Sequence, residues 1–512
     1  MPELDHQLSA RNGKWVLLAT ILASSVVFID MTIVNLALPV MQLDLDASFS
    51  VMQWVVEAYV LLLTSLMLVG GSLADAYGRR RLLCLGAGVF ALASAGAGFA
   101  ADGPQLIAAR ILQGIGGAML APASLALVSS SFPTATRGKA LGLWAAFSGI
   151  STAIAPPLGG LLIEAWSWRA VFFVNLPLLA IVIFVAYRYI PESRIENHHK
   201  RVDVAGAVTA VIALGALTFT FLRAGEHGFT DLLVALCGAI AALAGAAFVV
   251  IERRVENPML PLGIFASRAF AGLNLMTLIL FIAVSGMMFF LPMVLMQSFG
   301  YSPTQAGAAV IPSMLAMFII SPLMGRYIDR AGARLPILIG PWISALAYVL
   351  FALNDEAGYW TGLWLPIVVM GIGFGAWVTP LTSAVMSVAG EQRSGLASGI
   401  NNAVARLAQL LAIALLGLLA AHTFQEQLDL SLMAHNSGPE WLELLAPDRV
   451  KLGGMRAPAS LSLAAQSDLN QLIQAAFRDA FARVAWVAAG LCIGASAIGY
   501  WATSKPCARA RT

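Results

Sequence analysis

Charge is scarce in this chain. Only 11% of its 512 residues are Asp, Glu, Lys or Arg, whereas 59% are hydrophobic and the mean hydropathy is +0.82. Soluble domains carry about 25% charged residues, and disordered chains are polar and poor in apolar residues. Both classes are therefore excluded, and the main solvent of this chain must be lipid. The formal net charge of +3 gives no indication of nucleic-acid binding.

Motifs for metal, redox and phosphate chemistry are also absent. The four cysteines include no C-x-x-C pair, and Cys84, Cys237 and Cys492 lie inside apolar stretches, where packing of a small residue is the favoured interpretation. No G-x-x-x-x-G-K-[ST] phosphate-binding loop occurs, so nothing indicates direct use of ATP. We therefore expect neither a metal nor another cofactor.

Long apolar runs, by contrast, are abundant. A membrane-spanning helix needs about 20 apolar residues, and 14 stretches meet this requirement. The first has the basic residues Arg11 and Lys14 before it but no signal-peptidase site after it, so we interpret it as a true span. The predicted spans are 15–38, 52–74, 82–101, 104–129, 140–163, 168–190, 204–222, 231–251, 269–296, 305–324, 335–353, 361–388, 396–421 and 482–502. The sequence thus predicts an all-α integral membrane protein embedded in the lipid bilayer.

The basic residues predict the orientation of these spans. With the N-terminus in the cytoplasm, the cytoplasmic segments hold 21 of the 30 lysines and arginines. The short outer loops then hold only Arg169 and Arg223. Loops that stay in the cytoplasm are enriched in Lys and Arg. We therefore expect a multi-pass protein with both termini in the cytoplasm.

A repeat divides the chain. Residues 71–81 read GSLADAYGRRR and residues 325–334 read GRYIDRAGAR. Three residues of each copy align at a constant offset of 254 positions, namely Gly71, Asp75 and Gly78 with Gly325, Asp329 and Gly332. Both copies follow the second helix of a six-helix set if two of the spans are an insertion. The predicted organisation is a six-helix half at 1–190, two inserted helices in 191–260, and a second six-helix half at 261–512. Two repeated halves around a central site are typical of alternating-access carriers.

The segment 422–480 interrupts this rhythm between the last two spans. It is polar, and Leu469, Leu472, Ile473, Ala476, Phe477 and Ala480 follow helical spacing within it. We interpret these residues as an amphipathic helix that lies on the membrane. An external cap and a tolerated loop insertion remain equally open as roles for the segment.

A charge at the centre of the bilayer costs about 2.5–3.5 kcal/mol on insertion scales and so needs a reason, and four charged residues inside the predicted spans stand out. They are Asp30, Glu57, Arg110 and Arg406. Asp30 is a candidate for a structural salt bridge or for a proton carrier. Arg110 keeps its proton in normal use, so its role must be to pair with a neighbour or to influence that neighbour's protonation. For Arg406 we favour a residue that packs or lines a cavity over a coupling role.

Glu57 lies one helical turn from Trp54, so the acid and the aromatic ring share a helix face. A carboxylate beside an aromatic ring suits an organic cation, through ion pairing and cation–π attraction. The alternative is an acid at the level of the outer headgroups. At the predicted inner mouth, Asp75 with Arg79, Arg80 and Arg81 favours a latch between adjacent helices, and the repeat at Asp329 and Arg330 supports that interpretation.

These residues carry a resemblance. GSLADAYGRRR is similar to the loop signature of the major facilitator superfamily, and RILQGIGGA resembles a second motif of that superfamily at Arg110, Gln113 and Gly114. DMTIVNLALP resembles an element of its 14-helix drug:proton antiporters of the EmrB/QacA type, and WRAVFFVNLP extends the match. The antiporter motif of helix 5 appears as STAIAPPLGG, with Pro156, Pro157, Gly159 and Gly160 present and with Ser151 and Ala155 in place of glycines.

The resemblance implies a major facilitator fold and proton-driven export of lipophilic, often cationic, compounds across a bacterial inner membrane. By motif position it implies that Asp30 and Arg110 couple protons and that Trp54 and Glu57 recognise a cation. Further candidates for substrate binding are Asn35, Gln113, Asn402 and Arg406, and those for gating are Gly71, Asp75, Gly78, Arg79, Arg80, Asp329 and Arg330.

A dedicated exporter of a lipid, a siderophore or a self-made metabolite is the alternative on the same fold, whereas a channel or a sensor lacks the polar lining or the signalling domain that it needs. The partners expected are the small-molecule substrate, protons and the bilayer, with the transporter working as a monomer and with no catalysis of bond making. A periplasmic adaptor protein would be required only for an export route across two membranes.

Overall fold

The computed structural model describes residues 10–193, 203–255, 258, 260, 262–354, 358–389, 394–434, 441 and 444–504. All regular secondary structure within these residues is helical. Fourteen helices in the described part of the chain are long and apolar enough to cross a membrane, and each overlaps one predicted span. The all-α membrane fold predicted from hydropathy is therefore confirmed.

Seven helices form the six spans of the N-terminal half. Two of these helices begin at a residue whose side chain caps the N-terminus. Ser48 accepts a hydrogen bond from Val51 N at the start of α2, and Asp102 accepts one from Gln105 N at the start of α4. The sixth span is made by α6 and α7 together. The bounds are α1 Ala10–Asp44, α2 Phe49–Tyr77, α3 Arg79–Gly98, α4 Gly103–Ser131, α5 Thr134–Ala165, α6 Ala170–Phe173 and α7 Asn175–Tyr189.

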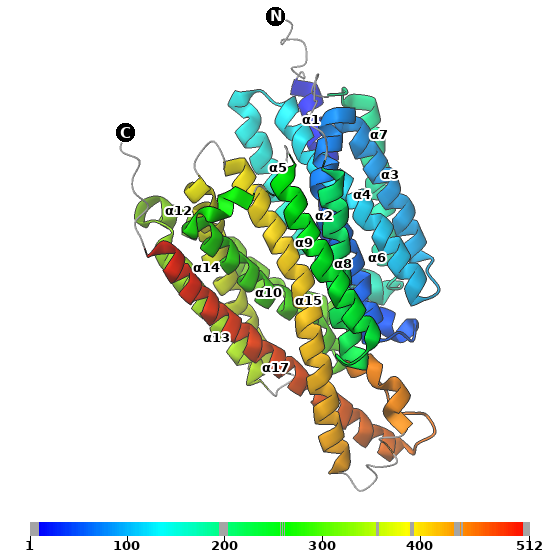
Figure 1. Ribbon diagram of the computed structural model, residues 1–512. Helices are drawn as coiled ribbons and strands as arrows, with labels where there is room; N and C mark the ends of the chain where they lie inside the picture. Colours follow the sequence, from blue (N-terminus) through cyan, green and yellow to red (C-terminus); the bar gives the residue numbers. More distant parts are fainter. Residues whose placement is uncertain are drawn as a thin grey trace, which may run out of the picture.

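The two inserted helices are α8 (Val204–His227) and α9 (Leu232–Arg254). In Figure 1 they run side by side between α2 and α15, and α8 packs against both of those helices. Asp231 caps α9 and forms an ion pair with Arg223 at 2.9 Å. The hydrogen bonds from Arg223 lower the pKa of the Asp231 carboxyl to about 2. The Asp231 carboxylate thus stabilises the turn between the two inserted helices.

The C-terminal half repeats the six-span plan. Its second span is made by α11 and α12 together, and its fourth begins with the short π-helix η2. The bounds are η1 Leu262–Ala266, α10 Arg268–Gln297, α11 Pro303–Ala309, α12 Ile311–Ala331, α13 Arg334–Ala352, η2 Tyr359–Leu363, α14 Trp364–Ala389, α15 Ser394–Met433 and α17 Leu463–Thr503. The helices α1 and α17 begin and end, respectively, at the same end of the molecule, which we call the inner end (Figure 1).

The interpretation of residues 469–480 as a helix lying on the membrane is wrong. These residues belong to α17, one continuous helix from Leu463 to Thr503, and α15 also continues past its predicted span to Met433. The two helices extend together beyond the outer end of the bundle (Figure 1). The apolar stripe is buried because α17 packs on α15, as in the pair Phe424 and Phe477, whose ring centroids lie 6.3 Å apart. A helix face that finds a protein partner does not need the lipid surface.

Candidate functional site

The centre of the N-terminal half holds a buried ion pair. Asp30 of α1 and Arg110 of α4 are each 1% exposed, and Arg110 Nη1 lies 2.5 Å from Asp30 Oδ2. The Arg110 guanidinium also donates through Nε to the carbonyl of Val55 on α2 at 2.8 Å and lies 4.2 Å from the centre of the Tyr59 ring. The two charges that the sequence singled out separately are therefore direct partners, and they tie α1, α4 and α2 together.

Three amide and hydroxyl groups complete this network. Gln113 donates to Asp30 Oδ1 at 3.2 Å and to the Ser94 hydroxyl at 2.8 Å, while its own oxygen accepts from Arg110. Asn175, the first residue of α7, donates to the same Asp30 oxygen at 3.1 Å. Sequence reasoning placed Gln113 among the substrate-binding candidates and missed Asn175 and Ser94. The stretch WRAVFFVNLP contained the signal for Asn175, since it is the polar residue of an apolar run.

Arg406 of α15 joins this region from the other half. Its Nη1 lies 3.1 Å from the sulfur of Met31, the neighbour of Asp30 on α1. Arg406 also lies within electrostatic range of Tyr59, whose ring contacts Arg110. The structure thus brings Arg406 next to the Asp30–Arg110 network instead of leaving it as a separate feature of the C-terminal half.

Glu57 and Trp54 both face the inserted helix α8. The Glu57 side chain is fully buried, and it interacts with the Thr218 hydroxyl of α8, although neither carboxylate oxygen has a hydrogen bond of ordinary geometry. The Trp54 ring centre lies 6.4 Å from that of Phe219, the next residue of α8. The shared helix face predicted for this pair is confirmed. Thr218 and Phe219 were missed because nothing in the sequence indicates which span lies opposite α2.

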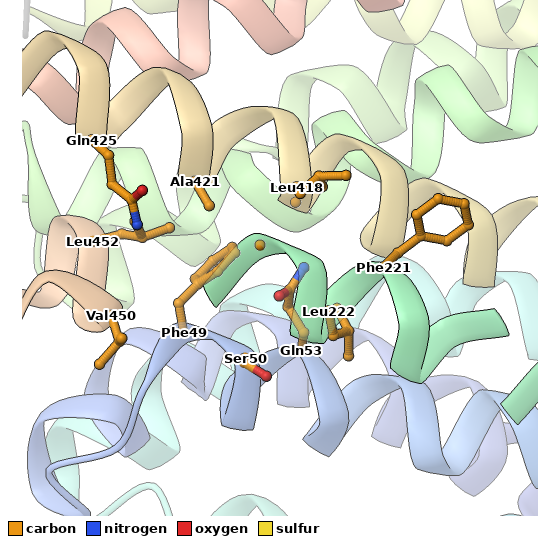
Figure 2. Close-up of a pocket in the computed structure, with 12 residues that line it drawn as sticks. Phe49, Ser50, Gln53, Phe221, Leu222, Leu418, Ala421, Gln425, Val450 and Leu452 are labelled. Atoms are coloured by element: carbon orange, nitrogen blue, oxygen red, sulfur yellow. The ribbon is translucent and has the colours of Figure 1, made fainter. Parts of the chain in front are cut away.

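One turn toward the outer end, the same α2 face borders a small pocket with a cavity volume of about 20 Å³. Gln53 donates to the carbonyl of Ile413 on α15 at 2.8 Å, and Gly417 makes room for it, since a Cβ there would overlap the Gln53 amide. Figure 2 shows aromatic, amide and aliphatic side chains lining the pocket from α2, α8, α15 and η4 (Ala446–Gly454). The inserted helix α8 therefore lines a pocket at the junction of the two halves.

The remaining substrate-binding candidates lie apart from these contacts. Asn35 of α1 is half-buried, and its side-chain oxygen is buried without a hydrogen-bond partner. Asn402 of α15 is exposed. Its neighbour Asn401 is the buried residue, and it accepts a hydrogen bond from Thr277 of α10 at 2.8 Å.

At the inner end of the N-terminal half, the basic cluster of Arg79, Arg80 and Arg81 contacts an acid that was not predicted from the sequence. Glu192, just after α7, accepts hydrogen bonds from the backbone N–H groups of Arg80 and Arg81 and lies 3.6 Å from Arg80 Nε. Arg79 N also donates to Ser193 O at 3.0 Å. Gly78 has φ +110°, and a Cβ there would lie 2.6 Å from the Glu192 carboxylate. These contacts join α3 to the end of α7 within one half.

The remaining gating candidates lie at the inner ends of α2 and α12. Asp75 belongs to the last turn of α2, and its side chain lies outside the part of the chain that the structure describes. A Cβ on Gly71 would touch Pro122 of α4 at 3.6 Å. In the second copy of the repeat, Asp329 and Arg330 are exposed at the end of α12, and Gly332 ends that helix at φ +81°.

The helix 5 motif packs against both halves. A Cβ on Gly160 would lie 2.5 Å from the carbonyl oxygen of Pro303 on α11, and one on Gly159 would lie 2.9 Å from the Ile33 side chain of α1. On the facing helix, a Cβ on Gly307 would overlap the Pro156 carbonyl oxygen, while Pro157 is the adjacent residue of α5. Small residues allow such close approach of helix backbones.

Polar contacts reinforce this junction at the outer end. Glu164 of α5 accepts hydrogen bonds from the Ser302 hydroxyl and from Thr304 N, just before and within α11. Gln42 of α1 accepts from Gln297 of α10 at 2.9 Å. Gln42 also donates at 2.8 Å to the carbonyl of Lys451, which lies in the segment 422–480, called the outer segment below. The two halves are thus joined at their outer ends, with the outer segment over the joint.

The buried pair can link protonation to helix position. Protonation of Asp30 would remove the negative charge that Arg110 pairs with, and a buried charge that loses its partner is strongly unfavourable. Because Arg110 also contacts α2, the change would be felt by several helices at once. No group of three or more His, Cys, Asp or Glu side chains able to hold a metal occurs among the described residues.

Fourteen candidate spans among the described residues, with a buried acid–base pair inside the N-terminal half, are typical of a secondary carrier of the membrane. The chain matches the family model of the Major Facilitator Superfamily over residues 20–413, and it belongs to this superfamily of transporters.

Several of its relatives are resistance or export proteins. The multidrug resistance protein Stp of Mycobacterium tuberculosis (strain CDC 1551 / Oshkosh) is 36% identical over 406 residues, which are 78% of this chain and 74% of that protein. The methylenomycin A resistance protein of Bacillus subtilis (strain 168) is 31% identical over 81% of this chain and 89% of its own length. The tetracenomycin C resistance and export protein of Streptomyces glaucescens is 32% identical over 80% and 77%, respectively.

Solved structures support the fold. A bacterial homologue of the human lysosomal transporter Spinster matches with a TM-score of 0.70, 18% identity and coverage of 98% of this chain and 100% of that chain. Tetrameric PepTSo2 matches with a TM-score of 0.61, 14% identity and coverage of 96% and 98%. The predicted major facilitator fold is therefore confirmed.

Proposed function

We propose that this chain is a proton-coupled antiporter that exports lipophilic, cationic compounds from the bacterial cytoplasm. The observation that carries the proposal is the Asp30–Arg110 pair, a carboxylate buried with a permanent cation at the centre of the N-terminal half. The resistance and export proteins among its relatives support the direction of transport.

In this mechanism Asp30 carries the proton, and Arg110 changes its contacts when Asp30 is protonated. A proton on Asp30 releases the Arg110 guanidinium, which remains bound to the Val55 carbonyl and to the Tyr59 ring of α2. Helices α1 and α4 then lose the ion pair between them and can shift relative to one another. Arg406 contacts Met31, the neighbour of Asp30, so the C-terminal half is placed to sense the same shift.

Cation recognition belongs to the α2–α8 interface in this proposal. Glu57 offers a carboxylate without a well-formed hydrogen bond, and Trp54 and Phe219 offer two aromatic rings beside it. An organic cation would gain ion pairing from the first and cation–π attraction from the others. The inserted helix α8 then supplies part of the recognition surface through Thr218 and Phe219, and not only membrane anchorage.

The test is transport by the purified protein in lipid vesicles with an imposed pH gradient, against monovalent lipophilic cations, neutral dyes and lipids. We expect cation movement that is driven by the gradient and abolished by a protonophore. Movement that is unchanged without a gradient would overturn the proton-coupled mechanism.

A dedicated exporter of one self-made metabolite is the second candidate. It is favoured by relatives that are named for single compounds, such as the puromycin resistance protein pur8 of Streptomyces alboniger and the tetracenomycin C resistance and export protein. The same vesicle panel separates the two. A broad response to unrelated cations supports the multidrug function, whereas transport of a single chemical series supports the dedicated one.

We also propose that the protein lies in the cytoplasmic membrane with both termini inside and works as a monomer, with an adaptor needed only for export across a second membrane. The excess of Lys and Arg in the alternate loops supports this orientation. Reporter fusions after Ser504 and within the outer segment test it, since the first must report the cytoplasm and the second the opposite side.

A further inference from the structure

Two arginines are held on aromatic rings at the inner end of the C-terminal half. Arg268 begins α10, and its guanidinium carbon lies 4.2 Å from the centre of the Trp501 ring on α17. Arg334 begins α13 and lies 5.8 Å from the ring of Tyr500. Adjacent residues of a helix point about 100° apart, so the two guanidiniums flank the last turn of α17. Arg268 also donates to the Trp501 carbonyl at 3.0 Å.

Glycines in the packed helices set this arrangement. A Cβ on Gly272 of α10 would lie 2.7 Å from the Ala502 side chain and 3.1 Å from the Trp501 ring. A Cβ on Gly499 of α17 would lie 2.9 Å from the Met276 sulfur and 3.1 Å from Ile337 of α13. The helices α10 and α13 therefore approach α17 closely, and helix packing determines where the arginines lie.

No ion pair within the described residues neutralises the charge of this cluster. Arg268 and Arg334 are exposed, and among the residues that the structure describes neither forms an ion pair with a carboxylate. Below them on α13, Leu335, Ile339 and Trp342 are each about half exposed, at 51%, 49% and 53%. An exposed apolar strip on a spanning helix faces lipid tails, and Trp and Tyr concentrate at the headgroup level. The cluster thus combines two cations with an adjoining surface for an acyl chain.

We propose that Arg268, Arg334, Tyr500 and Trp501 form a binding site for the headgroup of an anionic phospholipid. Guanidinium groups bind phosphate oxygens through charge-assisted hydrogen bonds, and basic residues at the membrane edge attract anionic lipids. The rings limit the motion of the two side chains, so less conformational freedom is lost on binding. A bound lipid would bridge α10, α13 and α17. The proposed orientation of the protein enters only in assigning this lipid to the cytoplasmic leaflet.

Two other arginines at the inner end provide a matched control for the proposed lipid site. Arg253 and Arg254 end α9 at the same inner end, and both are exposed. Among the described residues neither lies over an aromatic ring. Their replacement removes the same charge from the same end of the molecule but leaves the proposed site intact.

The experiment measures thermal unfolding of the purified full-length protein in detergent with added phosphatidylglycerol, phosphatidylcholine or inorganic phosphate. We expect phosphatidylglycerol to raise the unfolding temperature more than phosphatidylcholine, and phosphate alone to have no such effect. Loss of each arginine should weaken phosphatidylglycerol binding about fivefold. The R268Q/R334Q variant should therefore lose most of the preference, whereas R253Q/R254Q should keep it.

A second variant, Y500L/W501L, keeps both arginines and removes the rings, and it should show a reduced preference for phosphatidylglycerol. The single variants R268Q and R334Q carry the test if the double variant does not purify as a folded protein. The proposal is overturned by equal responses of the wild type to the two lipids, by an equal response to phosphate alone, or by a full preference in R268Q/R334Q. None of these readouts involves transport, so the result is independent of the proposed function.

Discussion

Asn175 and Gln113 donate to the same oxygen of Asp30, from helices α7 and α4. The other oxygen of Asp30 faces Arg110. The Asp30 carboxylate is thus held on both of its oxygens within the core of one half, by donors from two helices other than its own, α4 and α7. Any displacement of Asp30 relative to α4 or α7 must therefore break at least one of these contacts.

Asp30→Asn should abolish export driven by a pH gradient while the protein remains folded and inserted. The amide cannot carry the proton, but it can still accept hydrogen bonds from Gln113 and Asn175. We expect a lower unfolding temperature, because Arg110 loses its counter-charge and breaking a buried pair costs about 3–5 kcal/mol. Gradient-driven uptake into inverted vesicles measures the effect, with Asp468→Asn, an exposed acid of the outer segment, as the control. Wild-type export by Asp30→Asn would remove Asp30 from the coupling mechanism.

Glu57→Gln should weaken transport of monovalent cations while a neutral substrate is still exported. The change removes the carboxylate charge but keeps the shape of the side chain, so the loss should appear as weaker binding by about 1–3 kcal/mol. Export of a cation and of a neutral dye in the same vesicles measures both halves of the prediction. Thr218→Val is the companion variant, since it alters the polar group opposite Glu57 and leaves the charge in place. Equal loss of both substrates in Glu57→Gln would assign Glu57 to coupling, and equal retention would give it no role in recognition.

Gly78→Ala should destabilise the protein more than Gly332→Ala. Both glycines end a helix at positive φ, where a residue with a Cβ costs about 1–3 kcal/mol. At Gly78 the new Cβ also meets the Glu192 carboxylate, whereas at Gly332 no atom lies within 4 Å. The thermal unfolding temperatures of the two variants in one detergent make the comparison. Similar losses at the two sites would mean that Glu192 moves aside without cost.

Gly160→Ala should open the outer joint between the halves. The added Cβ would press on the backbone of Pro303 and Thr304, which cannot move as a flexible side chain does. We expect faster labelling by an impermeant maleimide of a single cysteine placed at Leu43, in a variant without the native cysteines. Gly149→Ala in the same helix is the control, because its nearest neighbour, the Phe318 ring, lies at an ordinary 3.9 Å. An unchanged labelling rate in Gly160→Ala would show that the joint tolerates the extra atom.

Parts of the candidate site could be read from the sequence because a charge in an apolar span is conspicuous by itself. Asp30, Glu57 and Arg110 were found in this way, and the shared face of Trp54 and Glu57 followed from helical spacing. The partners were harder to find. Thr218 and Ser94 are common polar residues of spans, and Glu192 lies in a loop where an acid is unremarkable, so only contact distinguishes them.

The surface helix predicted within 422–480 shows a second limit of prediction from the sequence. An apolar stripe at helical spacing determines that a helix has a face to bury, but it does not say whether lipid or protein will cover that face. The packing of α17 on α15 decided this in favour of protein.

The sequence by itself determined the fourteen spans, the expected orientation and the repeat of two halves, since each of these depends on the length, apolarity and charge of a local segment. Only the tertiary structure decided that Asp30 pairs with Arg110, that Glu57 faces an inserted helix and that Glu192 accepts hydrogen bonds from the basic cluster at the inner end. These pairs join residues that lie 80 to more than 160 positions apart, as for Asp30 with Arg110 and Glu57 with Thr218. Such contacts depend on which helices pack together and at what rotation, and a hydropathy pattern contains no information about either.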